Sequence, residues 1–144
     1  MSTANYDYGL GPHLMLECFG CSADKLSDPA VITAALDEFP AKIGMKRISP
    51  PYVFNCPSEG GVEAGITGVI LIEESHISVH TFPAASRAFV DVFSCREFDI
   101  NSAVSYMIGL FGANDHKAEV FSRGFQFVGE LGRSGEALAG EVKR

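Results

Sequence analysis

The segment GVILIEESHISVHTFPAASRAFVDVFSC, residues 68–95, carries the pattern that decides the fold. Residues 65–74 are rich in β-branched side chains, and residues 76–82 and 88–95 alternate between apolar and polar positions. Such runs are typical of strands, and alternation indicates that one face of each strand is buried. Because only a few residues separate the runs, we expect three strands joined by tight connections.

The residues before this segment predict one strand and one helix. Residues 13–20 form a short apolar run, and Ser27-Asp28-Pro29 is a typical helix start with proline in the first turn. In residues 29–44, apolar side chains recur with the spacing of one helix face. These side chains are Val31, Ile32, Ala35, Leu36 and Phe39. We expect Pro40 to break the last turn and Gly44 to end the helix.

The remaining segments complete the predicted sheet. Residues 46–57 contain β-formers but also two adjacent prolines, which favours an edge position because proline cannot donate to a strand ladder. Asn101 is a suitable cap for a helix over residues 102–112. A final strand is expected within residues 117–129, and residues 128–144 are polar enough to form a frayed tail.

This succession of elements predicts an α+β fold. Helices that return to one sheet give a two-layer sandwich, with the order β-α-β-β-β-α-β and one mainly antiparallel sheet covered by two helices. The 144 residues suit a single domain. A content of 47% hydrophobic and 20% charged residues excludes a disordered or collagen-like chain.

Charge and composition limit the partners and the compartment. The formal net charge of -7 repels phosphate backbones, so we expect no nucleic-acid partner. No signal-peptide pattern is present, and no run reaches the roughly 20 apolar residues needed to span a bilayer. We therefore expect a cytoplasmic protein without a membrane partner. Its four cysteines are then expected to be thiols: Cys18, Cys21, Cys56 and Cys95.

Two histidines share one face of the middle predicted strand, namely His76 and His80. Their simplest interpretation is a pair of hydrogen-bonded structural residues in a half-buried sheet. A hydrolase serine at Ser75 is disfavoured because the G-x-S-x-G pattern is absent. A zinc site combining the histidines with Cys18 and Cys21 lacks a complete second ligand pair of the usual spacing. The residues alone leave the structural and functional interpretations open.

The same segment resembles the bacterial and archaeal S-adenosylmethionine decarboxylase proenzymes. Their signature is close to ESHxxxHTWPE followed by a D-x-F-T-C segment. The ungapped spacing from Ser75 to Cys95 agrees with that signature, and weaker similarity extends from His13 to about Phe127. The resemblance therefore covers most of the chain, and the metal-free chemistry of that family becomes the expectation.

The resemblance implies that the peptide bond between Glu74 and Ser75 breaks without hydrolysis. Ser75 Oγ would attack the Glu74 carbonyl, and the resulting ester would eliminate to leave a pyruvoyl group as the self-generated cofactor. Two pieces would result, residues 1–74 (β chain) and 75–144 (α chain). In the family this group forms a Schiff base with the substrate amine and accepts the electrons left by carbon dioxide, as pyridoxal phosphate does elsewhere.

The resemblance also assigns helpers to Ser75. His80 matches the processing base that removes the serine α-proton during elimination. Thr67 lies where the family places a hydroxyl that supports processing, and Cys95 matches the acid that returns a proton to the substrate carbon. Members of the family form homodimers of cleaved protomers, so we expect a homodimer here.

Departures from the family pattern bear on the substrate. Ala84 replaces the glutamate that holds the nucleoside ribose in the family, and residues 58–64 lack the aromatic side chain that stacks on adenine. A basic amino acid needs neither contact but needs an anion for its distal cation, which Glu59 or Glu63 would supply unless both belong to a solvated loop. Phe82, which replaces the family's tryptophan, is a third candidate contact.

These departures favour L-arginine or L-ornithine as the substrate, with S-adenosylmethionine as the alternative. Both alternatives place the enzyme in polyamine biosynthesis. A non-catalytic regulatory relative with the same fold is a further alternative, which would release no carbon dioxide from any of the three compounds.

Overall fold

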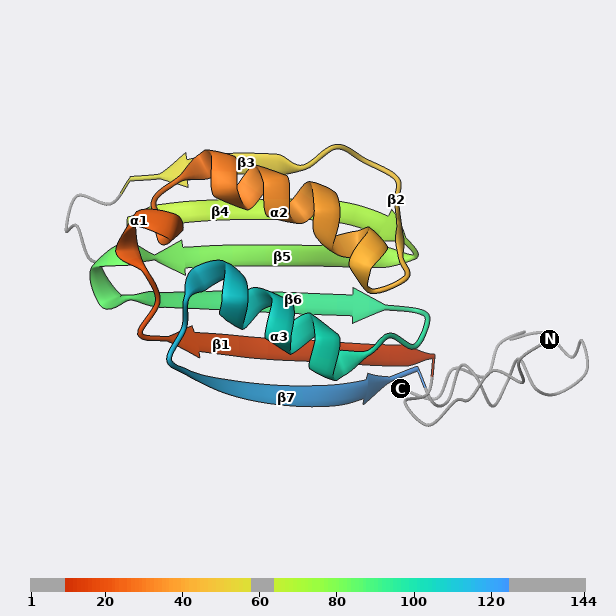
Figure 1. Cartoon of the computed structure of the whole chain (residues 1–144). Coiled ribbons are helices and arrows are strands. Elements are labelled where there is room, and N and C mark those ends of the chain that lie inside the picture. Colours follow the sequence, from red (N-terminus) through yellow and green to blue (C-terminus); the bar gives the residue numbers. More distant parts are fainter. Residues whose placement is uncertain (1–9, 58–63, 125–144) are drawn as a thin grey trace, which may run out of the picture.

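The computed structural model describes residues 10–57 and 64–124, which form one antiparallel sheet and the helices beside it (Figure 1). The sheet order is β2-β4-β5-β6-β1-β7, and β3 also pairs with β4. The strands are β1 (Gly11–Phe19), β2 (Lys46–Arg47), β3 (Tyr52–Cys56), β4 (Gly65–Glu73), β5 (Ser75–Phe82), β6 (Arg87–Ser94) and β7 (Asp115–Arg123). The three predicted central strands are thus β4, β5 and β6, and all their pairings are antiparallel.

The helices lie on one face of this sheet (Figure 1). They are α1 (Ala23–Leu26), α2 (Pro29–Lys42) and α3 (Ile100–Phe111), and a short 3-10 turn, η1 (Pro83–Ala85), follows β5. Helix α2 contacts β3 and β4, whereas α3 contacts β1. The predicted α+β two-layer sandwich is confirmed. Within the described residues, no helix is long and apolar enough to cross a membrane.

The hydrophobic core lies between the helices and the sheet. Alternate residues of the central strands point into it: Ile70 and Ile72 of β4, Ile77 and Val79 of β5, and Val90 and Val92 of β6. The helices supply Leu36 and Phe39 from α2, and Met107 and Phe111 from α3. Since burial removes these side chains from water, this alternation fixes which face of the sheet the helices cover.

Helix α2 begins as predicted but does not break at Pro40. Asp28 is its N-cap and accepts a hydrogen bond from the Ala30 amide at 2.9 Å, with Pro29 in the first turn. The expected break is wrong because the Pro40 ring is buried in the core, and its carbonyl accepts the Met45 amide at 2.8 Å. Packing of the ring offsets the missing amide donor.

The expected cap of α3 is also wrong. Asp99, rather than Asn101, is the N-cap, and its carboxylate accepts the Ser102 amide at 3.0 Å. That hydrogen bond stabilises the charged form and lowers the pKa of Asp99. Asp and Asn are equally suitable caps by type, so residue type alone does not select Asp99 over Asn101.

The strand count differs from the prediction at the edge of the sheet. The predicted order has five strands, whereas residues 46–57 supply two more, β2 and β3, which both pair with β4. The prolines do keep this segment at an edge, as expected. Helix α1 was not predicted. Strand β7 confirms the final strand as far as Arg123, and the predicted tail, 128–144, lies outside the described residues.

A buried hydroxyl ties α1 to two strands of the sheet. Thr81 is 2% exposed, and its Oγ1 donates to the Leu26 carbonyl at 2.7 Å. The same oxygen accepts the Ile66 amide at 2.9 Å. Removing the hydroxyl would therefore leave a buried donor and a buried acceptor without a partner.

We expect Thr81→Val to lower the free energy of unfolding by about 2–6 kcal/mol, since each of the two unsatisfied buried groups costs about 1–3 kcal/mol. Urea denaturation followed by circular dichroism measures the change. Thr81→Ser is the matched control, because it keeps the hydroxyl and removes one methyl group worth roughly 1 kcal/mol. Equal losses for the two variants would contradict a role for the hydroxyl.

Candidate active site

The sheet face opposite the helices carries most of the polar and aromatic side chains of the strands. No helix covers this open face within residues 10–57 and 64–124. By strand alternation and register, the open face includes His13, Met15, Glu17, Thr67, His76, Ser78, His80, Phe89, Asp91, Phe93, Glu119 and Phe121. The prediction that His76 and His80 share a face is therefore confirmed.

At one end of the open face, the turn between β4 and β5 places Glu74 and Ser75 beside Cys95. The Cys95 amide donates to the Glu74 carbonyl at 3.2 Å, and Ser75 pairs with Ser94, the residue before Cys95. Ser75 has φ of 130°, a region that side-chain-bearing residues rarely adopt and that costs about 1–3 kcal/mol. Backbone strain and an amide donor thus meet at the predicted scissile bond.

Cys95 is held firmly next to this turn. The Ser94 side chain is buried and accepts the Arg96 amide at 2.9 Å, which shapes the chain after β6. The start of β1 packs against the same backbone, where a β-carbon on Gly11 would overlap the Ser94 carbonyl. Only glycine permits this close approach. The position of the thiol is therefore set by backbone contacts from two strands.

The electrostatic surroundings keep Cys95 protonated. Burial raises the pKa of the Cys95 thiol, and the nearby negative charge of Glu74 raises it further. The positive charge of Arg123 acts in the opposite direction but does not cancel the increase. A thiol is the form needed for a proton donor, so this environment suits the acid role predicted for Cys95.

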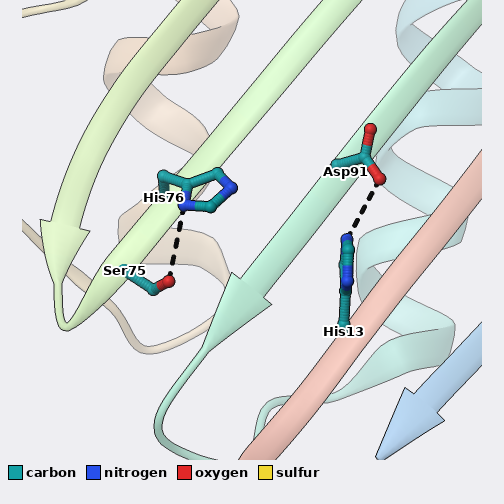
Figure 2. Close-up of polar contacts among 4 residues, drawn as sticks. All are labelled: His13, Ser75, His76 and Asp91. Atoms are coloured by element: carbon teal, nitrogen blue, oxygen red, sulfur yellow. Dashed lines mark hydrogen bonds and ion pairs between the residues drawn. The ribbon is translucent and has the colours of Figure 1, made fainter. Parts of the chain in front are cut away.

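His76 lies next to Ser75 on the same strand. Its Nδ1 is 3.5 Å from Ser75 Oγ, at the long end of hydrogen-bond distances (Figure 2). The His76 ring meets the Phe93 ring edge-on, with 6.1 Å between centroids, and the Arg123 guanidinium lies 4.0 Å from the centroid of Phe93. A cation, a histidine and an aromatic ring therefore lie near the end of β5 that carries the predicted cleavage site.

A second histidine joins this group from β1. His13 Nε2 is 3.1 Å from Asp91 Oδ1, and both side chains are partly buried (Figure 2). The His13 ring also lies against Phe93, with a centroid separation of 5.8 Å. The sequence interpretation gave His13 no role, because the contact requires the register in which His13 opposes Phe93 across β1 and β6. Alternation along β1 places His13 on the correct face, but no local pattern predicts its partner.

The structure brings Thr67 and His80 together, but at a distance from Ser75. Thr67 Oγ1 is 3.1 Å from His80 Nδ1, and Cys56 Sγ donates to the same oxygen at 3.4 Å. His80 is five residues along the extended strand from Ser75, a separation of about 16 Å. One copy of the chain therefore does not place its own His80 on its own Ser75.

The candidate substrate contacts lie farther along β5. Phe82 is half-buried and meets Phe89 edge-on at 5.5 Å, about 23 Å along the strand from Ser75. Beyond it is a cavity of about 400 Å³, whose lining residues are Ser27, Asn55, Cys56, Pro57, Ala64, Gly65, Ile66, Pro83 and Ala84. Ala84 lines this cavity, whereas Phe82 does not. Glu59 and Glu63 lie outside the described residues.

The zinc site considered from the sequence, which would combine two cysteines with the two histidines of β5, does not form. Cys18 and Cys21 are buried in the core under the helices, whereas His76 and His80 lie on the open face. Burial raises the pKa of Cys18 to about 12, so its thiol is not prepared to bind a cation. Among the described residues, no group of three or more acidic, histidine and cysteine side chains could hold a metal ion.

Comparison with known proteins identifies the family to which this geometry belongs. Residues 12–124 match the sequence model of the family described as S-adenosylmethionine decarboxylase. The chain belongs to this family. An S-adenosylmethionine decarboxylase proenzyme of Pyrococcus furiosus is 33% identical over 118 residues, which are 81% of each chain. A proenzyme of Clostridium kluyveri with the same description is 33% identical over 125 residues, 85% of this chain and 94% of its own.

A solved structure supports the same assignment. The crystal structure of the adenosylmethionine decarboxylase from Aquifex aeolicus aligns with a TM-score of 0.66 and 28% identity. The alignment covers 78% of this chain and 89% of that one. The resemblance seen in the sequence is thus confirmed.

Membership of this family gives the class of reaction. The chain is a pyruvoyl-dependent decarboxylase, a carboxy-lyase of polyamine synthesis, whose pyruvoyl group forms from a serine by self-processing. The interpretation that favours arginine or ornithine receives no support from these comparisons. The relatives described above are S-adenosylmethionine decarboxylases, which fits the alternative substrate better.

Proposed function

We propose that the chain is a self-processing S-adenosylmethionine decarboxylase in which Ser75 becomes the pyruvoyl group. The observation that carries this proposal is the hydrogen bond from the Cys95 amide to the Glu74 carbonyl, at 3.2 Å. This bond joins the predicted scissile carbonyl to the predicted proton donor. It is formed next to a serine whose backbone is strained.

The geometry suits the first step of processing. When Ser75 Oγ adds to the Glu74 carbonyl carbon, negative charge develops on the carbonyl oxygen. The Cys95 amide is already directed at that oxygen and would stabilise the charge, as donors of an oxyanion hole do. Collapse breaks the peptide C–N bond and gives the ester, so the strained linkage at Ser75 is the one that is lost.

The second step leaves Glu74 as a carboxylate. A base removes the α-proton of Ser75, the Cβ–Oγ bond breaks, and the electron pair leaves with the Glu74 carboxyl group. The remaining dehydroalanine tautomerises to an imine, and water replaces its nitrogen to release ammonia and give the ketone. This sequence needs no oxidant, because each bond broken is matched by one formed within the chain or with water.

The surroundings of Ser75 fit a pyruvoyl group. The residue is half-buried, lies next to His76 and Cys95, and faces no covering helix in the described residues. Once formed, the group supplies a carbonyl that takes the substrate amine and accepts the electrons released with carbon dioxide. Cys95, held as a thiol, would then deliver a proton to the substrate carbon.

We expect Ser75→Ala to remain one chain, because no hydroxyl is left to form the ester. Intact-mass measurement should show residues 1–74 and 75–144 as separate pieces for the unchanged protein, and a single piece for the variant. Ser78→Ala is the matched control, since Ser78 lies on the open face of the same strand. Cleavage of the Ser75→Ala chain would refute the proposed route.

We also propose that two copies pair through the open face. His80 and Thr67 contact each other at one end of this face, whereas Ser75 and Cys95 lie at the other. When two such faces pack with opposite orientations, the His80 end of one copy meets the Ser75 end of the other. The predicted processing base would then reach the serine of its neighbour, which one copy alone does not allow.

A mixture of two inactive variants tests this pairing. Ser75→Ala and His80→Ala should each remain uncleaved when expressed alone. When the two are co-expressed with tags of different mass, the His80→Ala chain should be cleaved, because the other chain supplies His80 to its intact Ser75. His76→Ala co-expressed with Ser75→Ala is the comparison for a base acting within one chain. Absence of cleavage in the first mixture would contradict pairing of this kind.

The proposal also names the substrate, S-adenosylmethionine. Ala84 leaves the cavity beyond β5 without a carboxylate in its described lining, where the family places a ribose contact. The comparisons nevertheless favour S-adenosylmethionine, which retains an amine and a carboxylate for the shared chemistry whatever holds its nucleoside.

We expect carbon dioxide release from carboxyl-labelled S-adenosylmethionine to exceed release from arginine and ornithine. Ala84→Glu should lower the KM for S-adenosylmethionine about tenfold, because a charge-assisted hydrogen bond contributes about 1.5–3 kcal/mol. Ala85→Glu is the control, since Ala85 is a neighbouring exposed alanine that does not line the cavity. Release from arginine or ornithine alone would overturn the substrate, and release from none would favour a non-catalytic relative.

A further inference from the structure

We infer that self-processing completes the proton donor: the carboxylate that cleavage leaves on Glu74 stays on the Cys95 amide and holds the Cys95 thiol protonated. This inference rests on the proposed cleavage between Glu74 and Ser75. It assigns a function to the newly formed end of the β chain, which the reaction would otherwise leave as a by-product.

The contact that carries the inference exists before cleavage. The Cys95 amide donates to the Glu74 carbonyl oxygen at 3.2 Å. Elimination turns that same carbonyl carbon into a carboxylate, so one neutral acceptor becomes two oxygens that share a negative charge. A charged acceptor binds an amide more strongly than a neutral one. The existing donor therefore retains the new terminus.

The end of the β chain has little freedom to leave this position. Glu73, the residue before the terminus, opposes Lys46 in the sheet, and their side chains form an ion pair at 3.7 Å. Ile72 is 1% exposed in the core. Glu74 is thus a single residue beyond an anchored strand, on the Cys95 side of the turn.

The charges around Cys95 show what the new carboxylate changes. Two charges act on the thiol, Glu74 from the β4–β5 turn and Arg123 from β7. The rings of His76 from β5 and His13 from β1 lie beside Phe93, the ring that Arg123 contacts. Arg96 follows Cys95 in the chain. In the uncleaved chain, Arg123 opposes the effects of burial and of the Glu74 side chain on the pKa of the thiol.

Cleavage adds a further negative charge at backbone contact distance. A nearby negative charge disfavours a thiolate and so raises the pKa of the Cys95 thiol. Chains that have formed the pyruvoyl group therefore hold the proton of the Cys95 thiol more firmly than uncleaved chains do, until the substrate carbon takes it. Because it acts through Cys95 rather than on the substrate, the Glu74 carboxylate is a positioning group.

Alkylation of Cys95 by iodoacetamide measures the thiol directly, with peptide mass spectrometry separating Cys95 from Cys56. The comparison is between cleaved Glu74→Gln protein and the uncleaved double variant Glu74→Gln/Ser75→Ala. Both lack the side-chain charge, so only the terminal carboxylate differs in charge between them. We expect the cleaved protein to react about tenfold more slowly at neutral pH, equivalent to an increase of about one pKa unit. Circular dichroism checks that both are folded.

Reduction of the ketone with borohydride serves as the control for the pyruvoyl group itself. The slow alkylation should persist after reduction, because the carboxylate remains. Equal or faster alkylation of the cleaved protein, or recovery of fast alkylation on reduction, would overturn the inference. If the unchanged protein is never cleaved, the proposed function fails instead, so the two failures are distinguishable.

Discussion

The rest of the structure depends on the antiparallel pairing of β5 with both β4 and β6. Because successive residues of a strand point to opposite faces, one register places Ile77 and Val79 in the core and His76 and His80 on the open face. A slip of one residue would exchange these two sets. Burial of the apolar set under α2 and α3 therefore also directs the two histidines to the open face.

Most of the fold could be predicted because most helices and strands carry a recognisable pattern of residues in their own sequence. Richness in β-branched residues predicted β4, alternation predicted β5 and β6, and the Asp28-Pro29 pair predicted the start of α2. The predictions were wrong where contacts made in the folded chain decide the local structure. Pro40 stays helical because its ring is buried, and Asp99 takes the cap because its carboxylate accepts the Ser102 amide.

The sequence proposes residues for the candidate site, whereas their contacts come from the structure alone. The resemblance selected Ser75, His80 and Cys95 by spacing, yet spacing along a chain does not state which side chains meet. The structure joins Cys95 to Glu74 through the backbone and joins His80 to Thr67 instead of Ser75. His13 was missed because its contacts with Asp91 and Phe93 depend on the register between distant strands.

The contact between Arg123 and Phe93 has a consequence for the minimal length of the enzyme. Among the described strands, β7 lies at the outer edge of the sheet and pairs only with β1. As the last of these strands in the chain, it resembles a dispensable end. Its last residue, Arg123, nevertheless brings a guanidinium 4.0 Å from the centroid of the Phe93 ring. A chain shortened before β7 would lose that cation along with an edge strand. A shortened chain that is to keep this cation beside Phe93 must therefore extend at least to Arg123.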